Sequence, residues 1–257
     1  MSNLTIQLLI ATMNQNPSDY SLLEKMHVQC DAIVCNQCDR FSYAEIEWNG
    51  HSIKWFDFDE KGVGLNRNNA LMRATADYVV ICDDDMVFVD HYPELLLDGF
   101  KKNPKADILI YNLAGRKLNS NVHRINRTNF LRYGAARIAA KTSALKSNGI
   151  FFNTSFGGGT ECQHGEDNIF LSECLEKGLK IYSYPVIIAK LTNDRPSTWR
   201  KKFDNKYFSD QGKLYKQVSR KFWKELCFID SVRHHKRYSC SWYSAYSSMV
   251  APNRTIR

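Results

Sequence analysis

Short apolar runs alternate with amphipathic stretches along the first three quarters of the chain. Apolar runs of about four to eight residues, bounded by polar turns, are typical of buried strands, whereas apolar residues at a spacing of three or four are typical of helices. The runs predict strands over residues 4–11, 32–35, 53–58, 78–82, 108–111, 137–140 and 181–189, the last interrupted at Pro185. The spacing predicts helices over 17–26, 62–76, 92–102 and 166–177, with Gly178 ending the last one.

The order strand, helix, strand recurs and predicts an α/β fold, a mostly parallel central sheet with helices on both faces. Ligands of such sheets bind where the carboxyl ends of the strands meet. Polar residues gather at these predicted ends: Thr12 and Asn14, then 36–39, then 83–85. The sequence therefore predicts a ligand site at this edge of the sheet.

The C-terminal part has a different composition. From Lys190 to Arg257 there are 16 Lys and Arg against 5 Asp and Glu, whereas the whole chain has a net charge of +8. This division predicts a main domain over 1–190, with a polar loop over 116–129, and a basic extension over 191–257 that is helical from about 204 to 232. Aromatic residues lie among these cations: Trp199, Tyr207, Phe208, Phe222 and Trp223.

Two interpretations of this basic, aromatic extension stay open. Aromatic and cationic side chains on one helix suit the surface of an anionic membrane. Alternatively, the aromatic residues pack on the core and the cations face water. A basic tail can also bind nucleic acid, but that interpretation gives the acidic motifs described below no purpose.

Size and composition fit a soluble globular protein. The 257 residues, 44% of them hydrophobic, are enough for a sizeable core. No run approaches the roughly 18 apolar residues of a membrane span, and no basic residue precedes the run over 4–11, so we expect no signal peptide and a cytoplasmic location. Of the eight cysteines, Cys35 and Cys38 have a C-x-x-C spacing. Zinc would need Cys162 and His164 as further ligands; buried apolar cysteines are the alternative.

Three consecutive carboxylates, Asp83 to Asp85, directly follow the apolar strand "YVVIC". Adjacent like charges repel one another, and a divalent cation relieves that repulsion. Hard oxygen ligands suit Mg²⁺ or Mn²⁺, which share one or two carboxylates with substrate phosphates. The alternative is a solvated acidic turn ahead of the next helix. The position after a buried strand favours the metal.

The stretch "GVGLNRNNALMRATADYVVICDDDMVF" is similar to the core of family 2 glycosyltransferases, which have the GT-A fold. That family carries a G-x-x-x-x-R-N-x-G/A helix, a strand and an acidic D-x-D motif, matched here by Gly62 to Ala70 and by Asp83 to Asp85. "GEDNIFLSECLEKGLKI" resembles its acceptor-side E-D motif, and "LLIATMNQ" its first strand. The resemblance covers roughly residues 4 to 190 and is specific for fold and reaction type, not for the sugar.

The resemblance implies roles for individual residues. Thr12, Asn14 and Asp39 match positions that hold the nucleotide base. Arg67 would contact the base or the diphosphate, with a helix-surface arginine as the alternative. In the acidic motif, Asp83 would bind the ribose and share the metal, Asp84 would contact the nucleotide sugar, and Asp85 would bind the metal. In the acceptor-side motif, Asp167 would be the general base and Glu166 would support the acceptor or the base.

Two positions depart from the family pattern. Ala11 stands where a proline often ends the first strand, and "VIIAKLTNDR" lacks the histidine that frequently completes the metal shell. Lys190 touching a phosphate and His164 approaching from its loop are the substitutes considered.

The predicted reaction is a metal-dependent, inverting sugar transfer in surface polysaccharide synthesis. The expected donor is a nucleotide diphosphate sugar, a UDP-sugar in the first instance. The expected acceptor is a saccharide or a lipid-linked saccharide, reached from the inner face of the cell membrane. Two alternatives stand beside it: a sugar-phosphate nucleotidyltransferase, disfavoured because "ATMNQNPSDY" has no glycine-rich phosphate loop, and a non-catalytic polyanion-binding protein.

Overall fold

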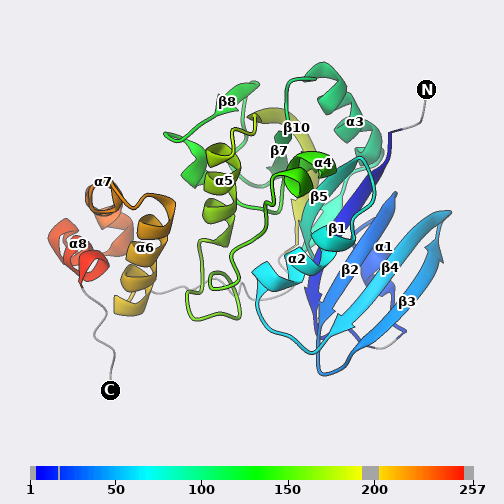
Figure 1. Cartoon of the computed structure of the whole chain (residues 1–257), viewed down its shortest axis with the longest axis horizontal. Coiled ribbons are helices and arrows are strands. Elements are labelled where there is room, and N and C mark those ends of the chain that lie inside the picture. Colours follow the sequence, from blue (N-terminus) through cyan, green and yellow to red (C-terminus); the bar gives the residue numbers. More distant parts are fainter. Residues whose placement is uncertain (1–3, 17, 193–202, 252–257) are drawn as a thin grey trace.

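A ten-stranded sheet forms the centre of the molecule (Figure 1). The structure is a computed structural model and describes residues 4–16, 18–192 and 203–251. The strands are β1 Ile6–Met13, β2 Asp31–Gln37, β3 Ser42–Trp48, β4 His51–Phe58, β5 Tyr78–Asp83, β6 Met86–Phe88, β7 Ile108–Ala114, β8 His123–Ile125, β9 Ile138–Lys141 and β10 Ile181–Leu191. The helices are α1 Ser21–Lys25, α2 Val63–Arg73, α3 Tyr92–Lys102, α4 Thr142–Ser147, α5 Glu166–Glu176, α6 Asn205–Val218, α7 Trp223–Tyr238 and α8 Trp242–Val250, with a 3₁₀ turn at Phe130–Arg132.

The strands lie in the order β3-β4-β2-β1-β5-β9-β7-β10-β6, and β8 pairs with β10. The α/β fold is confirmed. The sheet itself is mixed, more so than the mostly parallel sheet expected from the sequence. Four pairings are parallel (β4 with β2, β2 with β1, β1 with β5, β7 with β10). Antiparallel strands β3, β6, β8 and β9 complete it.

Helices cover both faces of the sheet, which explains why the central strands are apolar throughout. Successive residues of a strand point to opposite faces. Leu8 and Ile10 of β1 therefore join one core cluster with residues of α1 and α3, whereas Leu9 joins a second cluster with residues of α2, α4 and α5. The two clusters fix the sheet between its helical layers.

The register of the central strands brings the polar strand ends together. Thr12 of β1 lies opposite Asn36 of β2, and Ala11 lies opposite Asp83 of β5. The predicted meeting of polar residues at the carboxyl edge is thus confirmed.

Most predicted elements are present with shifted ends, and the helix over 92–102 is matched in full. The prediction missed β3, which forms a hairpin with β4 through Asn49 and Gly50, both at positive φ. That pair is the usual sequence of a two-residue hairpin turn. The prediction also missed α4 and α8, and the helix expected over 204–232 is broken into α6 and α7. Pro185 does interrupt β10, whose register against β7 shifts between Ser183 and Ile187.

The last three helices form a unit with its own apolar core, to which Phe208, Tyr215, Cys227, Tyr238, Ala245 and Met249 contribute. Leu214 of α6 also packs with Ile169 of α5 and with Phe156, which connects this unit to the sheet domain. Tyr207 and Phe208 pack inward, as one of the two interpretations of the extension expected. Trp199 lies outside the described residues.

We predict that Gly212→Ala destabilises the C-terminal unit. Alanine usually stabilises a helix by about 1 kcal/mol relative to glycine. Here, however, a Cβ at position 212 would overlap with the carbonyl oxygen of Met249. Because that neighbour is backbone, we expect a net loss of about 2 kcal/mol in the free energy of unfolding, measured by urea denaturation. Gly158→Ala is the matched control, since nothing lies within 4 Å of its added Cβ; equal stability of the two variants would refute the prediction.

Candidate active site

Three consecutive polar residues of α2 organise the carboxyl edge of the sheet. The amide of Asn66 donates to the carbonyl oxygens of Thr12 and Cys35, at 3.3 and 2.9 Å, and so joins the helix to the ends of β1 and β2. Asn68 exchanges two hydrogen bonds with the backbone of Phe152, at 2.9 and 2.7 Å. Helix α2 therefore holds the two strand ends and the segment that leads to the glycine-rich loop in one place.

Arg67, between these two asparagines, lies buried among three carboxylates. Its Nη2 donates to Asp83 at 2.7 Å, and its Nη1 donates to Glu166 at 3.1 Å and to Asp167 at 3.0 Å. The side chain is only 4% exposed, and its guanidinium lies 5.2 Å from the ring centroid of Phe152. Arg67 is thus not a helix-surface arginine; it links the acidic end of β5 to the first turn of α5.

The pKa values of this cluster are shifted by burial and by its charges. Burial alone would lower the pKa of Arg67, but the charges of Asp83, Asp167 and Glu166 outweigh it and raise that pKa. Burial, followed by the charge of Glu166, raises the pKa of Asp167 above its ordinary value, although Arg67 opposes the shift. A carboxylate with a raised pKa is a stronger base, which suits a group that must accept a proton.

The glycine-rich loop before α5 packs tightly against this cluster. Gly157 has a φ of +102°, and a Cβ there would lie 2.7 Å from Val63 and 2.8 Å from the Glu166 carboxyl carbon. Val63 also donates its backbone N–H to the carbonyl oxygen of Gly158 at 3.0 Å. A side chain at position 157 would displace Glu166, so the glycine keeps the loop against α2.

The three aspartates after β5 have different surroundings. Asp83 pairs with Arg67, and Asp84 accepts a 2.7 Å hydrogen bond from the Thr12 hydroxyl. Asp85 is partly buried; burial, together with the charges of Asp83 and Asp84, raises its pKa. Its carbonyl oxygen accepts a 2.7 Å hydrogen bond from the backbone N–H of Thr192, so the acidic turn is tied to the end of β10.

These carboxylates fit a shared metal ion better than a closed metal cage. Nowhere in residues 4–16, 18–192 and 203–251 do three or more His, Cys, Asp or Glu side chains converge as a complete metal-binding group. Mg²⁺ and Mn²⁺ are commonly held by one or two carboxylates together with substrate phosphates. The oxygen donors of Asp85 and Asp83 meet that requirement. Among the residues that the structure describes, Cys35 and Cys38 join no such group with Cys162 and His164.

A second polar cluster lies at the ends of β2 and β4; the sequence interpretation singled out residues 36–39 but not Asp57. The buried Asp57 accepts from Asn36 at 2.7 Å, from Arg40 at 2.7 Å and from Trp55 at 3.1 Å. Asn36 in turn accepts from the backbone N–H of Gln15 at 3.0 Å. An aspartate inside an apolar strand was the available signal, since a buried charge needs partners.

The remaining predicted residues lie around the edge of this site. Asn14 is exposed, has a φ of +55° and donates its backbone N–H to Gln37 at 2.9 Å. Asp39 is 97% exposed and 3.9 Å from Arg40. The structure therefore joins Thr12 to Asp84, and Arg67 to Asp83, Glu166 and Asp167, whereas Asn14 and Asp39 stand apart. The nucleotide-binding roles of these residues stay predictions.

The two substitutes considered for the missing histidine lie in different surroundings. His164 contacts Gln211 of α6 at 2.9 Å and stacks on Tyr207, with 4.9 Å between ring centroids. Lys190 lies on β10 opposite Val87 and is exposed. His164 therefore connects its loop to the C-terminal unit.

The sequence profile of the family described as "Glycosyl transferase family 2" matches residues 36–160. The chain carries a family 2 glycosyltransferase domain. The matched stretch contains the Arg67 helix and the aspartates after β5, and the family expected from the sequence motifs is confirmed.

Individual proteins show the same likeness. A poly-beta-1,6-N-acetyl-D-glucosamine synthase from Staphylococcus epidermidis is 27% identical over 128 residues, which are 47% of this chain and 31% of the synthase. The chain thus spans about a third of that relative's length.

Among solved structures, the crystal structure of S. aureus TarS 1–349 in complex with UDP-GlcNAc matches with a TM-score of 0.63 and 14% identity, over 96% of this chain and 76% of that one. TarS 1–349 in complex with UDP matches with a TM-score of 0.61 and 14% identity, over 91% and 72%. At such identities the likeness establishes the fold, which is that of the family 2 domain.

We predict that Arg67→Met costs about 3–5 kcal/mol of stability, because it leaves buried carboxylates without their counter-charge. The loss should be larger at pH 8 than at pH 5. Burial and the charge of Glu166 raise the pKa of Asp167, and Arg67 opposes that shift, so the variant should raise this pKa further above its unfolded value. The folded protein then binds an extra proton in the window between the two pKa values, and stability falls as pH rises. Urea denaturation at both pH values measures this.

Arg73→Met is the matched control on the same helix. Its guanidinium lies 4.7 Å from the ring centroid of Phe56 and donates to the carbonyl oxygen of Asn69 at 2.9 Å. Its loss should be smaller and independent of pH over this range. A loss for Arg67→Met that is the same at pH 5 and pH 8 would contradict the assigned role of its charge.

Proposed function

We propose that this protein is a metal-dependent, inverting glycosyltransferase that takes a sugar from a UDP-sugar. The observation that carries the proposal is the pairing of Arg67 with Asp83 on one side and with Glu166 and Asp167 on the other. It unites the acidic motif of a donor site with a pair of acidic side chains suited to proton removal. The family 2 match and the UDP and UDP-GlcNAc complexes of the similar TarS structures support the choice of donor.

The strand ends of β1, β2 and β5 would bind the nucleotide diphosphate. Asp85 and Asp83 would hold Mg²⁺ or Mn²⁺ beside it, whose charge offsets that of the leaving diphosphate. The hydroxyl of Thr12 holds the Asp84 side chain, and Asn66 holds the backbone of Thr12. These strand ends are therefore ordered before a donor binds. Preordered polar groups lower the cost of binding and of orienting the donor.

Asp167 would act as the general base. It accepts the proton of the acceptor hydroxyl while the acceptor oxygen attacks the anomeric carbon from the face opposite the diphosphate. The bond to the diphosphate oxygen breaks in the same displacement, which inverts the configuration at that carbon. Burial, together with the charge of Glu166, keeps the pKa of Asp167 raised.

The acceptor would reach Asp167 past the glycine-rich loop. A hollow of about 650 Å³ lies between that loop and α6, lined by Phe156, Glu161, Cys162, Lys213, Lys216 and Arg220, among others. Phe156 adjoins Gly157, which packs on Glu166. We propose a saccharide or lipid-linked saccharide as acceptor, in the synthesis of a bacterial surface polysaccharide, in keeping with the name of the similar synthase.

Asp167→Asn should retain donor binding and lose transfer. We expect the release of UDP from a UDP-sugar with Mn²⁺ to fall by about 10²- to 10⁴-fold, the usual contribution of a general base. The Kd for UDP, measured by calorimetry, should change little. Unchanged turnover would remove Asp167 from the mechanism.

Glu166→Gln serves as the comparison, because it removes a like charge and leaves the base in place. The charge of Glu166 raises the pKa of Asp167, so its removal should lower that pKa. Activity that depends on the ionised base then persists to lower pH, and the acid limb of the pH–rate profile should shift to lower pH. A shift of that limb to higher pH would show that Asp167 is not the titrating base.

UDP should stabilise the protein against heat only when a divalent ion is present, and Asp85→Asn should abolish that effect. The reason is that Asp85 would share the ion with the diphosphate, and a ligand that binds only the folded state raises its melting temperature. Thermal shift with UDP, with and without Mn²⁺, measures this. Asp90→Asn is the control, an 81% exposed carboxylate beyond β6. Stabilisation by UDP without a divalent ion would contradict the proposal that Asp85 shares a metal ion with the diphosphate.

A further inference from the structure

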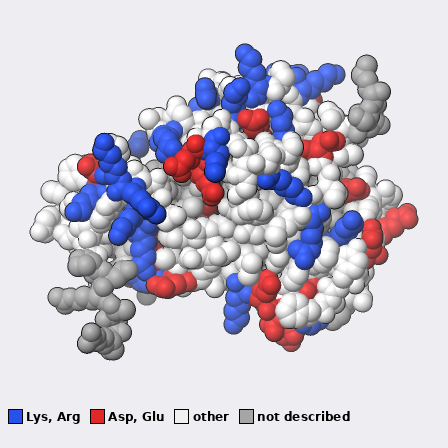
Figure 2. All heavy atoms as spheres, viewed as in Figure 1, with Lys and Arg blue, Asp and Glu red and all other residues white. Residues whose placement is uncertain are grey.

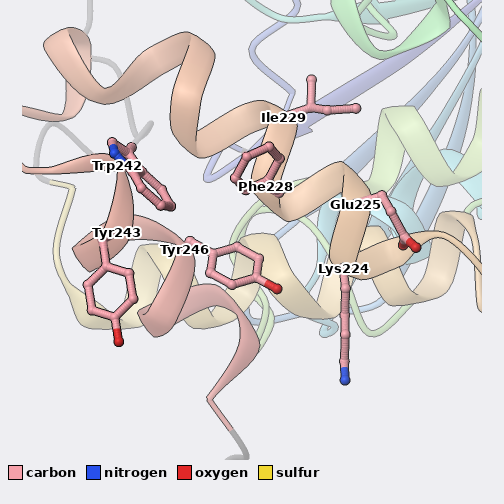
Figure 3. A pocket seen from close by; sticks show the side chains of 7 residues that line it. All are labelled: Lys224, Glu225, Phe228, Ile229, Trp242, Tyr243 and Tyr246. Atoms are coloured by element: carbon pink, nitrogen blue, oxygen red, sulfur yellow. The ribbon is translucent and has the colours of Figure 1, made fainter.

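Helices α7 and α8 carry large apolar side chains on their outer face. Phe228, Ile229, Val232, Trp242 and Tyr243 are each between 43% and 67% exposed. Together with Tyr246, Lys224 and Glu225, four of them line a hollow of about 780 Å³ between the two helices (Figure 3). Contiguous exposed apolar surface of this kind marks an interaction site more often than chance.

The inner face of the same helices is already packed. Cys227, Ser231 and Tyr238 of α7, with Ala245 and Met249 of α8, are buried. The exposed residues are therefore not those that form the core of this unit; the two helices carry apolar residues on both their inner and their outer sides. We call the exposed set, Phe228, Ile229, Val232, Trp242 and Tyr243, the aromatic face.

Basic residues predominate in and just before α7, and Lys224 lies beside the aromatic face. Residues 219–251 contain six Lys and Arg against Glu225 and Asp230. Asp230 accepts a 2.6 Å hydrogen bond from the Tyr238 hydroxyl and faces inward, which leaves Glu225 as the exposed carboxylate of this stretch. Figure 2 shows Lys and Arg side chains gathered at the end of the molecule that α6 to α8 form, beside uncharged surface.

We propose that the aromatic face docks on the surface of an anionic lipid bilayer. Trp and Tyr favour the headgroup region, where one edge of the ring is dry and the other wet. Lys and Arg beside them bind anionic headgroups, with their aliphatic stems on the apolar layer. No helix of the described ranges has the length and apolar character that crossing a bilayer requires, so the contact lies along the surface.

Charge decides between a membrane and a second copy of this chain. In a symmetric dimer through the aromatic face, the nearby cations of one copy would lie against those of the other, and like charges brought together oppose association. An anionic bilayer satisfies the apolar side chains and the cations at once. The docking needs no transferase activity, so its test is separate from that of the proposed function.

Co-sedimentation of the full chain with vesicles tests the proposal. We expect binding to vesicles of phosphatidylcholine with roughly 30% phosphatidylglycerol, because anionic headgroups attract basic segments, and little binding to phosphatidylcholine alone. Phe228→Ala with Trp242→Ala, and separately Lys221→Glu with Lys224→Glu, should each weaken binding by at least about tenfold. Phe41→Ala, which removes a 69% exposed aromatic next to β3, should have no effect.

The charge variants keep the test valid even if the double alanine variant folds poorly, because Lys221 and Lys224 are both exposed. Sedimentation velocity of the protein alone gives the second readout and should show one species at all concentrations. Equal binding to both kinds of vesicle, no binding, or a dimer that the aromatic-face variant dissolves would each overturn the proposal.

Discussion

A single guanidinium holds the candidate site together. Arg67 contacts three carboxylates, and its side chain is almost fully buried. One positive charge among three ionised carboxylates leaves the cluster negative, and Asp84 and Asp85 lie in the same turn as Asp83. Such a site attracts positive charge and disfavours further ionisation. Burial, reinforced by the neighbouring negative charges, raises the pKa values of Asp85 and Asp167. Binding a cation and accepting a proton are two responses to the same excess charge.

The neighbours of Arg67 on α2 explain why its charge can be used in this way. Asn66 and Asn68 fix the helix to the strand ends and to Phe152, so the guanidinium cannot swing away from the carboxylates. A buried ion cluster stabilises a fold only when its geometry is well satisfied. Here both terminal nitrogens of Arg67 bond carboxylates, and the two asparagines hold the helix in place through backbone groups of β1, β2 and the segment before the loop. The sheet edge, helix and loop therefore depend on one another.

Much of this arrangement followed from local patterns. We could predict the apolar strands, the Arg67 helix and the run of aspartates because each pattern lies within about a dozen residues. Their proximity could be predicted because parallel strands bring their carboxyl ends to one edge of a sheet. The hairpin of β3 and β4 was missed although Asn49 and Gly50 are typical of a hairpin turn. Strand β3 lies at the sheet edge, and glutamates alternate with its apolar residues, so it has no continuous apolar run. The partners of Arg67 were a different matter. Pairing across about a hundred residues leaves no trace in spacing, so a buried arginine and a surface one look alike in the sequence.

That separation has a consequence for how the protein is made. Arg67 and its partners on α5 lie 99 and 100 residues apart, and Asn68 lies 84 residues from Phe152. Contacts of such length form late, since the chain between them must first be ordered. During synthesis, the helix with Arg67 leaves the ribosome long before Glu166 and Asp167 exist. Until then, Asp83 is the one carboxylate partner of Arg67 that has been synthesised. The charged cluster of the folded protein is incomplete at that stage. The cluster around Arg67 can therefore close only after α5 has been synthesised.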